Sequence, residues 1–232
     1  MTPALIILQA RVASVRLPGK VLAQIGTRTL VGHCLARLTA GRAAPVLLAT
    51  TERPEDDCLV AIASACGVQV FRGPSADVLR RFTLAATAAK AQFVVRATAD
   101  NPALDIDAPG RVLELLRSSG ADYAGEQGLP YGAAVEAFTT DALLRADGLA
   151  TDARDREHVT TLLRRDTARF STQLGPAPAG LARSDIRVTV DTADDLAFMR
   201  AVSARLGDPV DEPPLAQVIA ASDALLADAR CA

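Results

Sequence analysis

The sequence predicts an α/β protein built around a mostly parallel β-sheet. Short apolar runs alternate along the chain with segments whose apolar residues recur at helical spacing, the order expected of βαβ units. Half of the 232 residues are hydrophobic, yet only 3% are aromatic and none is tryptophan. Small aliphatic side chains therefore fill the core, as in tightly packed α/β layers. The length fits one large domain.

The first half of the chain carries the clearest alternation. Its first apolar run, Ala4–Leu8, is continuous and ends at a polar loop, as a central buried strand should. Further strands are expected at Pro45–Ala49, Gly67–Phe71 and Gln92–Thr98. Apolar residues at helical spacing predict the helices between them, around Leu30–Leu38 and over Asp56–Ala65 and Ala76–Lys90.

The second half begins with a helix and then becomes rich in turn-forming residues. Asp107 is a suitable N-cap for a helix that has Pro109 in its first turn and runs to about Ser118. Glycines and a proline then make Tyr123–Tyr131 rich in turns, and Val135–Phe138 is a possible strand.

The remaining elements complete one domain. We expect helices at Asp141–Asp147, Asp155–Arg165 and Glu212–Ala229, and strands at Arg169–Leu174 and Ile186–Val190. Thr192 is expected to cap a helix that reaches Arg205, with Asp195 completing a capping box. Residues 1–232 are thus predicted to form a single domain, in which 123–170 is an inserted subdomain or a dimerisation arm.

Charge and composition argue against several classes of partner. A formal charge of −2 and few aromatic residues give no general attraction to nucleic acid or to an anionic membrane. The apolar run Ala4–Leu8 is too short for a secretion signal, and no stretch is long enough to span a membrane. The four cysteines are scattered without zinc-site spacing. We expect a reduced, cytoplasmic protein.

The loop after the first strand is the first candidate site. Ligands of open α/β sheets bind beyond the carboxyl ends of the strands, and here the loop carries Arg11, Arg16 and Lys20 with Ser14 and Gly19. Three cations suit a triphosphate, because arginine forks and a lysine ammonium both pair with phosphate oxygens. The loop has neither a G-x-G-x-x-G pattern nor a Walker A pattern. A solvated basic loop is the alternative interpretation.

Two aspartates are candidates for a metal site at the same sheet edge. Asp100 follows the fourth strand, and Asp191 follows the strand expected at Ile186–Val190. Carboxylates from two distant segments that meet at one edge would suit Mg²⁺. The alternatives are a turn-forming Asp before Asn101-Pro102 and an Asp at the entry to the helix capped by Thr192.

Several segments, in this order, resemble a known family. They are Ile7-Leu8-Gln9-Ala10-Arg11, Arg16-Leu17-Pro18-Gly19-Lys20, Val70-Phe71-Arg72-Gly73, Asp77-Val78-Leu79, Arg156-Glu157-His158-Val159-Thr160 and Val190-Asp191-Thr192. Together they resemble cytidylyltransferases of the spore-coat polysaccharide biosynthesis type. These are relatives of the acylneuraminate and 3-deoxy-manno-octulosonate cytidylyltransferases. The resemblance covers about residues 4 to 205.

The resemblance implies a fold, co-substrates and roles for individual residues. The fold would be a three-layer α/β/α sandwich of the nucleotide-diphospho-sugar transferase type, in a homodimer that uses CTP and Mg²⁺. Catalysis would depend on Arg11 and Lys20, and the metal on Asp100 and Asp191. The nucleotide would be bound by Gln9, Ala10, Arg11, Ser14, Arg16, Lys20, Arg72, Gly73, Asp77 and Thr98, and the acceptor by Glu136, Glu157 and His158.

The sequence also departs from the family pattern. Relatives usually have Gly-Ser-Thr where this chain has Ala13-Ser14-Val15, and Ala13 lacks the backbone freedom of glycine. The usual Gly-Leu-Asp-Val-Glu becomes Gly132-Ala133-Ala134-Val135-Glu136, which removes one carboxylate. The acceptor side has thus lost polarity, so the acceptor need not be the sugar used by near relatives.

The hypothesis is attack of an acceptor oxygen on the α-phosphorus of CTP, with release of pyrophosphate. The acceptor is a sugar acid, another sugar, or a small phosphonate or phosphate. The rivals are a transferase that uses another nucleotide, a glycosyltransferase using Asp105-Ile106-Asp107 as a D-x-D metal motif, and a non-catalytic nucleotide-binding relative. No dedicated general base is evident, and His33 lies in a helical stripe where a structural role is expected.

Overall fold

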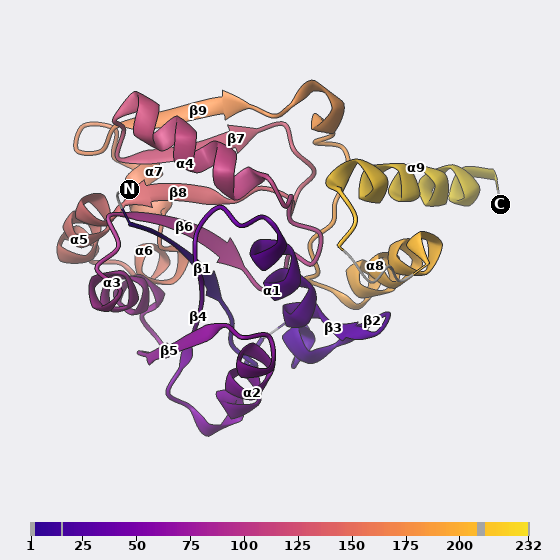
Figure 1. Cartoon of the computed structure of the whole chain (residues 1–232), viewed down its shortest axis with the longest axis horizontal. Helices are drawn as coiled ribbons and strands as arrows, with labels where there is room; N and C mark the ends of the chain where they lie inside the picture. The colour runs from indigo at the N-terminus through magenta and orange to yellow at the C-terminus, as the bar shows by residue number, and fades with distance from the viewer. Residues whose placement is uncertain (1–2, 15, 208–211, 232) are drawn as a thin grey trace.

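A seven-stranded sheet forms the centre of the computed structural model, which describes residues 3–14, 16–207 and 212–231 (Figure 1). The strands follow the order β5-β4-β1-β6-β8-β7-β9 across the sheet. Their bounds are β1 Ala4–Gln9, β4 Val46–Thr51, β5 Gln69–Gly73, β6 Phe93–Thr98, β7 Tyr123–Gln127, β8 Glu136–Thr139 and β9 Thr172–Pro176. The two-residue strands β2 Gln24–Ile25 and β3 Arg28–Thr29 pair separately.

The predicted mostly parallel sheet is confirmed. Strand β1 is parallel to β4 and β6, β4 is parallel to β5, and β7 is parallel to β9. Only β8 runs antiparallel to its neighbours β6 and β7. Because β1, β4 and β6 are parallel, the chain leaves all three at one edge of the sheet, and Gln9 and Thr98 end adjacent strands in register.

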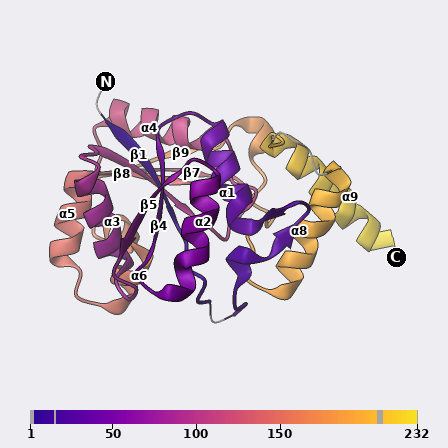
Figure 2. The ribbon, with the colours of Figure 1, turned by 60° about the horizontal axis from the view of Figure 1, so that its bottom comes forward.

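Helices cover both faces of this sheet. One hydrophobic core joins the sheet to α1 Leu30–Ala40, α2 Asp57–Ala65 and α4 Ala108–Ser119. The opposite core joins it to α3 Val78–Ala88, α5 Thr140–Leu149 and α7 Thr161–Arg165, with α6 Ala153–His158 against α3. Figure 2 shows α1 and α2 on one side of the strands and α3, α5 and α6 on the other. The architecture is therefore the predicted three-layer sandwich.

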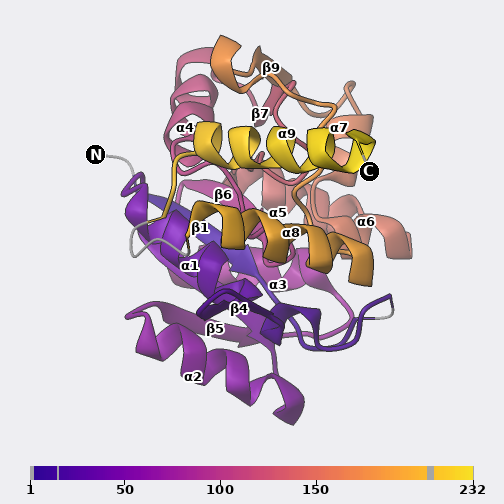
Figure 3. The same ribbon diagram turned by 90° about the vertical axis from the view of Figure 1, so that its right-hand side faces the viewer.

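Two C-terminal helices extend the first core. Helix α8, Ala193–Leu206, and helix α9, Leu215–Cys231, lie side by side beyond the sheet (Figure 3). The predicted capping box is confirmed, because Thr192 accepts from Asp195 N and the Asp195 carboxylate accepts from Thr192 N. The short 3-10 helices are Lys20–Leu22, Pro54–Asp56 and Ala179–Leu181.

Tyr123–Tyr131, predicted as turns, is the first local correction: its first five residues form β7. Hydrogen bonds to β8 and β9 on both sides stabilise that strand despite Gly125 in its middle. The side chains of Tyr123 and Leu174 occupy the space beside this glycine, where a Cβ would lie 3.1 and 3.5 Å from them. Tertiary pairing thus overrides the local turn preference.

Two further predictions need correction. Ile186–Val190 is not a strand of the sheet and makes a single bridge, from Arg187 to Tyr131. Directly after the bridge residue Tyr131, Gly132 has φ +99° and its backbone packs closely against Thr189. This conformation is not that of a strand, so strand pairing ends after the one bridge. The helix predicted over Asp155–Arg165 is divided into α6 and α7, because Val159 has φ 54° and ψ −56°.

The segment 123–170 supplies β7 and β8 to the central sheet and α5 to α7 to one face. Its predicted role as a subdomain or dimerisation arm stays a prediction. Among the described residues, no helix is long and apolar enough to cross a membrane.

Candidate functional site

Two adjoining pockets open where β1 and β6 end. The loop pocket, about 330 Å³, is lined mainly by the loop after β1, the end of β6 and the segment around Glu157. The strand pocket, about 490 Å³, is lined mainly by β7, β8 and the loop between them. Of the predicted site residues, the loop pocket brings together Gln9, Ala10, Arg11, Ser14, Arg16, Lys20, Thr98, Asp100, Glu157, His158 and Asp191. Glu136 lines the strand pocket.

Lys20 lies at the centre of the loop pocket, between the two predicted metal ligands. Its Nζ is 3.2 Å from Asp100 Oδ2 and 2.9 Å from Asp191 Oδ1, and it donates to Val190 O at 2.7 Å. Gly19, at φ 69° in the left-handed region, begins the short helix that carries Lys20. The lysine side chain is only 11% exposed, so these carboxylates hold its charge in place.

The backbone explains how two carboxylates 91 positions apart in sequence meet. Val190 N donates to Asp100 O at 2.8 Å, and Thr189 Oγ1 donates to the same oxygen at 3.2 Å. Thr98 Oγ1 donates to Asp100 Oδ1 at 2.6 Å and orients that side chain. The extended segment before Asp191 thus docks on the turn after β6 without becoming a strand.

Asp191 is the most heavily paired carboxylate of this site. Burial opposes its ionisation, but hydrogen bonds from Lys20 and Arg187 and the charge of Arg16 outweigh burial and lower its pKa. Arg16 Nη2 reaches Asp191 Oδ1 at 2.8 Å, while Arg187 Nη2 reaches Oδ2 at 2.9 Å. The group is therefore anionic at neutral pH and surrounded by cations.

The first residues of the loop, Arg11 and Val12, are held by contacts away from the Asp100–Asp191 pair. Asp56 accepts from Val12 N at 2.7 Å. Arg11 Nη2 pairs with Glu157 Oε1 at 2.8 Å, joining the loop to the end of α6. Both partners of this pair are more than a third exposed, so their mutual attraction is largely screened and can be exchanged for a ligand.

Glu136 is the centre of the strand pocket. Arg96 Nη1 donates to its Oε2 at 2.6 Å, Tyr123 Oη donates to Oε1 at 2.9 Å, and Thr160 Oγ1 lies within 3.1 Å of both oxygens. Burial opposes ionisation of Glu136, but the Arg96 charge and these donors outweigh burial and lower its pKa. Burial and the nearby Glu136 charge in turn raise the pKa of Tyr123. The carboxylate is saturated with partners.

Three predicted nucleotide-binding residues lie outside the walls of both pockets. Arg72 donates to Thr51 O and Arg53 O at 2.9 Å and pairs with Asp57 at 2.6 Å. Gly73 allows close packing, since a Cβ there would lie 3.2 Å from Arg81 Cγ. Asp77 caps α3 by accepting from Arg80 N at 2.8 Å. Their contact with a nucleotide stays a prediction.

Sequence reasoning missed two arginines that line the loop pocket, Arg81 and Arg96. Arg81 is 1% exposed, and its Nε has no hydrogen-bond partner among the described residues. Burial and the nearby positive charge of Arg11 lower its pKa. A usable signal exists, because position 81 falls on the buried face of α3 with Val78 and Phe82, where an unpaired charge is unexpected.

The pair Asp100 and Asp191 also fits a divalent ion in its chemistry. Both offer hard carboxylate oxygens, and one oxygen of each already surrounds a single cationic atom, Lys20 Nζ. No cluster of three or more His, Cys, Asp or Glu side chains suited to a metal occurs in the described residues. A metal held here therefore needs further oxygen ligands from substrate or water.

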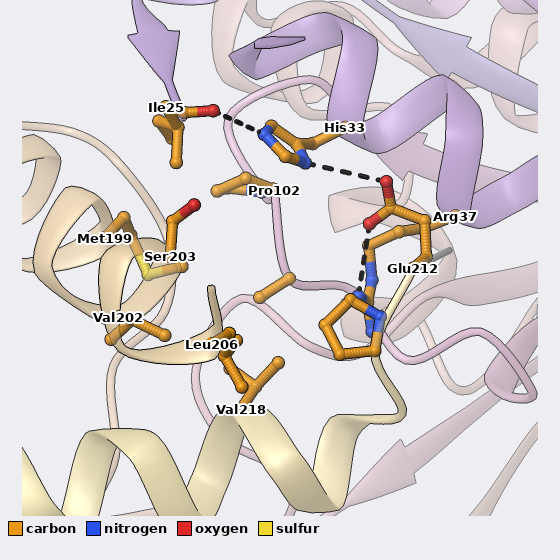
Figure 4. A pocket seen from close by; sticks show the side chains of 12 residues that line it. Ile25, His33, Arg37, Pro102, Met199, Val202, Ser203, Leu206, Glu212 and Val218 are labelled. Atoms are coloured by element: carbon orange, nitrogen blue, oxygen red, sulfur yellow. Dashed lines mark hydrogen bonds and ion pairs between the residues drawn. The ribbon is translucent and has the colours of Figure 1, made fainter. Parts of the chain in front are cut away.

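The other histidine, His33, occupies a separate small cavity of about 40 Å³ between α1, α8 and α9 (Figure 4). Its Nε2 donates to Ile25 O at 2.8 Å, and its Nδ1 lies 3.6 Å from Glu212 Oε1. Arg37 Nη1 reaches the other Glu212 oxygen at 3.5 Å. His33 thus ties α1 to the segment before α9, in line with the structural role expected of it.

Comparison with known sequences gives family matches along most of the chain. The profile of the cytidylyltransferase family matches residues 5–207. The spore coat polysaccharide biosynthesis protein SpsF of Bacillus subtilis is 30% identical over 91% of this chain and 90% of its own length. An uncharacterized protein of Methanocaldococcus jannaschii is 36% identical over 82% of this chain and 78% of its own. These matches confirm the resemblance.

Solved structures confirm the predicted nucleotide-diphospho-sugar transferase fold. A cytidylyltransferase from Leptospira borgpetersenii aligns with a TM-score of 0.90 and 27% identity, covering 98% of this chain and 96% of that one. A CMP:2-keto-3-deoxy-manno-octonic acid synthetase complexed with CTP aligns at 0.66 and 18% identity, covering 88% and 100%. A manganese complex of Rv0371c from Mycobacterium tuberculosis aligns at 0.62 and 17%, covering 86% and 98%. At these identities, the last two share the fold alone.

Proposed function

Because the chain belongs to the cytidylyltransferase family, we propose that it transfers the CMP group of CTP to an acceptor oxygen and releases pyrophosphate. Family membership confirms the predicted enzyme class, a CTP-dependent nucleotidyltransferase. The observation that carries the proposal is the convergence of Arg11, Arg16 and Lys20 with Asp100 and Asp191 in the loop pocket.

The residues of the loop pocket suit the charge changes of this reaction. Lys20 and Arg11 are assigned to the leaving pyrophosphate and the α-phosphate, where negative charge accumulates. Arg16, Gln9, Ala10, Ser14 and Thr98 are assigned to nucleotide binding. The partners that hold Lys20, Arg11 and Arg16 are carboxylates, so the oxygens of a triphosphate are chemically equivalent replacements.

Mg²⁺ is the proposed cofactor, with Asp100 and Asp191 as its protein ligands. Both carboxylates are anionic oxygen donors, as Mg²⁺ prefers, and the triphosphate and water would complete an octahedral set. The bound ion would neutralise phosphate oxygens and lower the pKa of an acceptor hydroxyl. For Asp100 and Asp191 to bind the ion, the Lys20 ammonium would have to leave these carboxylates and pair with the phosphates.

The acceptor is assigned to the strand pocket, close to Glu136 and His158. The classes that remain open are a sugar acid, another sugar, and a small phosphonate or phosphate. Ala133 and Ala134 are buried and half-buried in the loop before β8, so this stretch offers methyl groups where relatives usually carry a carboxylate. This supports an acceptor that differs from the sugars of near relatives.

We further propose a cytoplasmic homodimer in which 123–170 contributes the contact. Leu144 and Leu149, on α5 within this segment, are 48% and 43% exposed. Two exposed leucines on one helix suit an apolar contact with a second copy. Sedimentation equilibrium of the wild type and of a Leu144→Glu variant tests this, because a dimer held by α5 should dissociate in the variant.

One rival is disfavoured by its contacts, and two stay open. A D-x-D metal motif at Asp105-Ile106-Asp107 is disfavoured, because Asp105 is 3% exposed and pairs with Arg111 at 2.5 Å. A transferase for another nucleotide keeps all the phosphate contacts and differs only at the base. A non-catalytic relative would bind nucleotide without releasing pyrophosphate.

One assay separates these possibilities. Pyrophosphate release is measured with CTP, UTP, GTP or ATP, with Mg²⁺ or with chelator, against a panel of sugar acids, neutral sugars, phosphates and phosphonates. The proposal expects release with CTP and Mg²⁺ only. Release with a different nucleotide corrects the base assignment, and nucleotide binding without release under any condition rejects the enzymatic role.

A further inference from the structure

His158 occupies the boundary between the two pockets. Six residues line both of them: Arg16, Arg96, Thr98, Asp100, His158 and Asp191. This boundary is where an α-phosphate in the loop pocket and an acceptor in the strand pocket would meet. His158 contributes the one imidazole on these walls among the residues that the structure describes, and it is exposed to the cavity.

The carboxylates around this boundary are all engaged by cations. Asp100 pairs with Lys20, and Asp191 pairs with Lys20, Arg16 and Arg187. Each of these carboxylates already accepts from a cationic donor, so its oxygens are engaged and are not free to take a proton from an acceptor.

The same holds for the remaining acids of the two walls. Glu157 pairs with Arg11 at 2.8 Å, Glu136 with Arg96 at 2.6 Å, and Glu126 with Arg111 at 2.6 Å. By contrast, no hydrogen bond or ion pair engages the His158 ring within the described part of the chain. An imidazole with a free ring nitrogen is thus the available base.

The backbone beside His158 is strained in a way that holds this side chain at the boundary. Val159 has φ 54° and ψ −56°, and Thr160 N donates to His158 O at 2.5 Å, which closes a γ-turn of the rare positive-φ form. Such a conformation is costly for a β-branched residue and persists only when the surroundings fix it.

Contacts on both sides of the turn supply that fixation. Glu157 is held by Arg11, and Thr160 lies within 3.1 Å of both Glu136 oxygens. Val159 itself is fully buried in the core against α3 and α5. The turn therefore connects the loop pocket to the strand pocket and presents His158 between them. Strained backbone of this kind is concentrated at functional sites, which supports a functional role for this position.

The two histidines of the chain differ in whether their ring nitrogens have partners. His33 donates to Ile25 O and lies beside Glu212, so both its ring nitrogens have partners (Figure 4). His158 has a cavity on each side of it. His33 consequently serves as a matched control for any effect of removing an imidazole.

We propose that His158 is the general base of the transfer and that the acceptor is therefore a hydroxyl compound, not a phosphate or phosphonate; this rests on the proposed function. A free ring nitrogen of His158 takes the proton of the acceptor hydroxyl as its oxygen bonds to the α-phosphorus. The bond from the α-phosphorus to the bridging oxygen breaks, and its electron pair leaves with pyrophosphate. The imidazolium then returns its proton to solvent. A phosphate or phosphonate, already ionised at neutral pH, would need no base.

The charges facing His158 come from several elements. The cations on the two walls are Arg11, Arg16, Lys20, Arg81, Arg96 and Arg164, and the carboxylates are the paired ones described above. Only a neutral imidazole accepts a proton, so activity should fall on the acid side of the profile, and this acid limb should depend on His158. The pKa values of Asp191 and Glu136 are lowered, so these two groups are already ionised at neutral pH and contribute no such limb.

The test uses the full chain with CTP, Mg²⁺ and two sets of acceptors. The hydroxyl set is 3-deoxy-manno-octulosonate, N-acetylneuraminate and neutral hexoses. The ionised set, whose members carry no alcohol hydroxyl, is methyl phosphate and 2-aminoethylphosphonate. Pyrophosphate release is followed from pH 5.5 to 9 for the wild type, His158→Gln, His158→Ala and His33→Gln. We expect release with a hydroxyl compound and an acid limb that His33→Gln retains.

His158→Gln should lower kcat by about 100-fold and abolish the acid limb. The KM for CTP should stay within about threefold, and added imidazole should partly rescue His158→Ala, which a purely structural role would not produce. An unchanged acid limb in His158→Gln, or release with the ionised set alone, overturns the base while leaving CMP transfer intact. No release from the wild type with any acceptor overturns both proposals.

Discussion

The loop pocket and the strand pocket adjoin each other but hold their charges differently. In the loop pocket, Arg11 and Arg16 are 40% and 67% exposed, and each makes one ion pair. In the strand pocket, Arg96 and Glu136 are 14% and 18% exposed, and Glu136 accepts from Tyr123 and Thr160 as well. The first set can exchange its partners for a ligand, whereas the second is a fixed network.

This difference separates two kinds of effect. Substitutions in the loop pocket should change nucleotide turnover with little loss of stability, because exposed pairs contribute little to folding. Substitutions in the Glu136 network should lower stability, because removing one partner leaves a buried charge unpaired. Lys20 falls between these two cases, because it belongs to the loop pocket and yet its side chain is only 11% exposed.

The largest effect is expected for Lys20→Ala. Loss of the ammonium removes the cation assigned to the phosphates and leaves Asp100 and Asp191 facing each other. The kcat/KM for CTP should fall about 1,000-fold, as when a donor to a developing anion is deleted. Steady-state pyrophosphate release measures this, and circular dichroism should show an unchanged fold. Lys90→Ala, at the opposite end of the sheet, is the matched control, and equal activity of the two variants would remove Lys20 from the mechanism.

Glu136→Gln should be the most destabilising change of the series. The amide keeps the shape but leaves Arg96 without its anion, which should cost about 3 kcal/mol of unfolding free energy. Because the folded pKa of Glu136 is lowered, its stabilisation is present above the unfolded value, about pH 4.3, and is lost as pH falls through the folded value. Urea unfolding at pH 7 and near pH 3.5 measures both.

The matched control for Glu136→Gln is Glu114→Gln, on the exposed face of α4. That variant should unfold as the wild type does at both pH values. The gap between wild type and Glu136→Gln should narrow at acidic pH. A gap that is independent of pH would show that packing, not charge, explains the loss.

The two pockets also differ in how far the sequence predicts them. The loop pocket follows from one polar stretch after an apolar strand, so a rule about sheet edges brings Arg11, Arg16 and Lys20 to the site. Asp191 was assigned to the same edge although the strand expected before it is absent. Hydrogen bonds from Val190 N and from Thr189 Oγ1 to Asp100 O hold this segment at the sheet edge in place of strand pairing.

The strand pocket depends on tertiary pairing that local patterns do not encode. Gly125 and Gly128 suggest turns, yet β8 and β9 hold 123–127 as a strand. The break between α6 and α7 at Val159 is likewise invisible, because valine gives no sign of a positive φ. Arg81 could have been found, because a charged residue on the buried face of α3 is unexpected. Arg96 could not, because its half-buried strand position gives no sign of the two pockets that it lines.

Asp191→Asn tests the metal assignment within the loop pocket. The amide has a single acceptor oxygen, so it can accept from Lys20 or from Arg187 but not from both, and it removes half the charge offered to Mg²⁺. Turnover should therefore fall about 100-fold, with weaker binding of the metal. Activity titrated with MgCl₂ should saturate at a higher concentration. Asp194→Asn, exposed in the first turn of α8, is the control. An unchanged magnesium titration would exclude Asp191 as a ligand.

Arg16→Ala should produce the smallest effect and the sharpest contrast with Glu136→Gln. Arg16 is 67% exposed and its one ion pair, to Asp191, is shared with Lys20 and Arg187, so Asp191 remains paired without it. The KM for CTP should rise about fivefold, equivalent to 1 kcal/mol, with kcat and the unfolding midpoint nearly unchanged. Arg169→Ala is the matched control, since Arg169 is 63% exposed and also makes one ion pair, to Asp166. If Arg16→Ala instead lowers stability as much as Glu136→Gln does, the loop pocket is a fixed network too, and the division between an exchangeable and a rigid side is wrong.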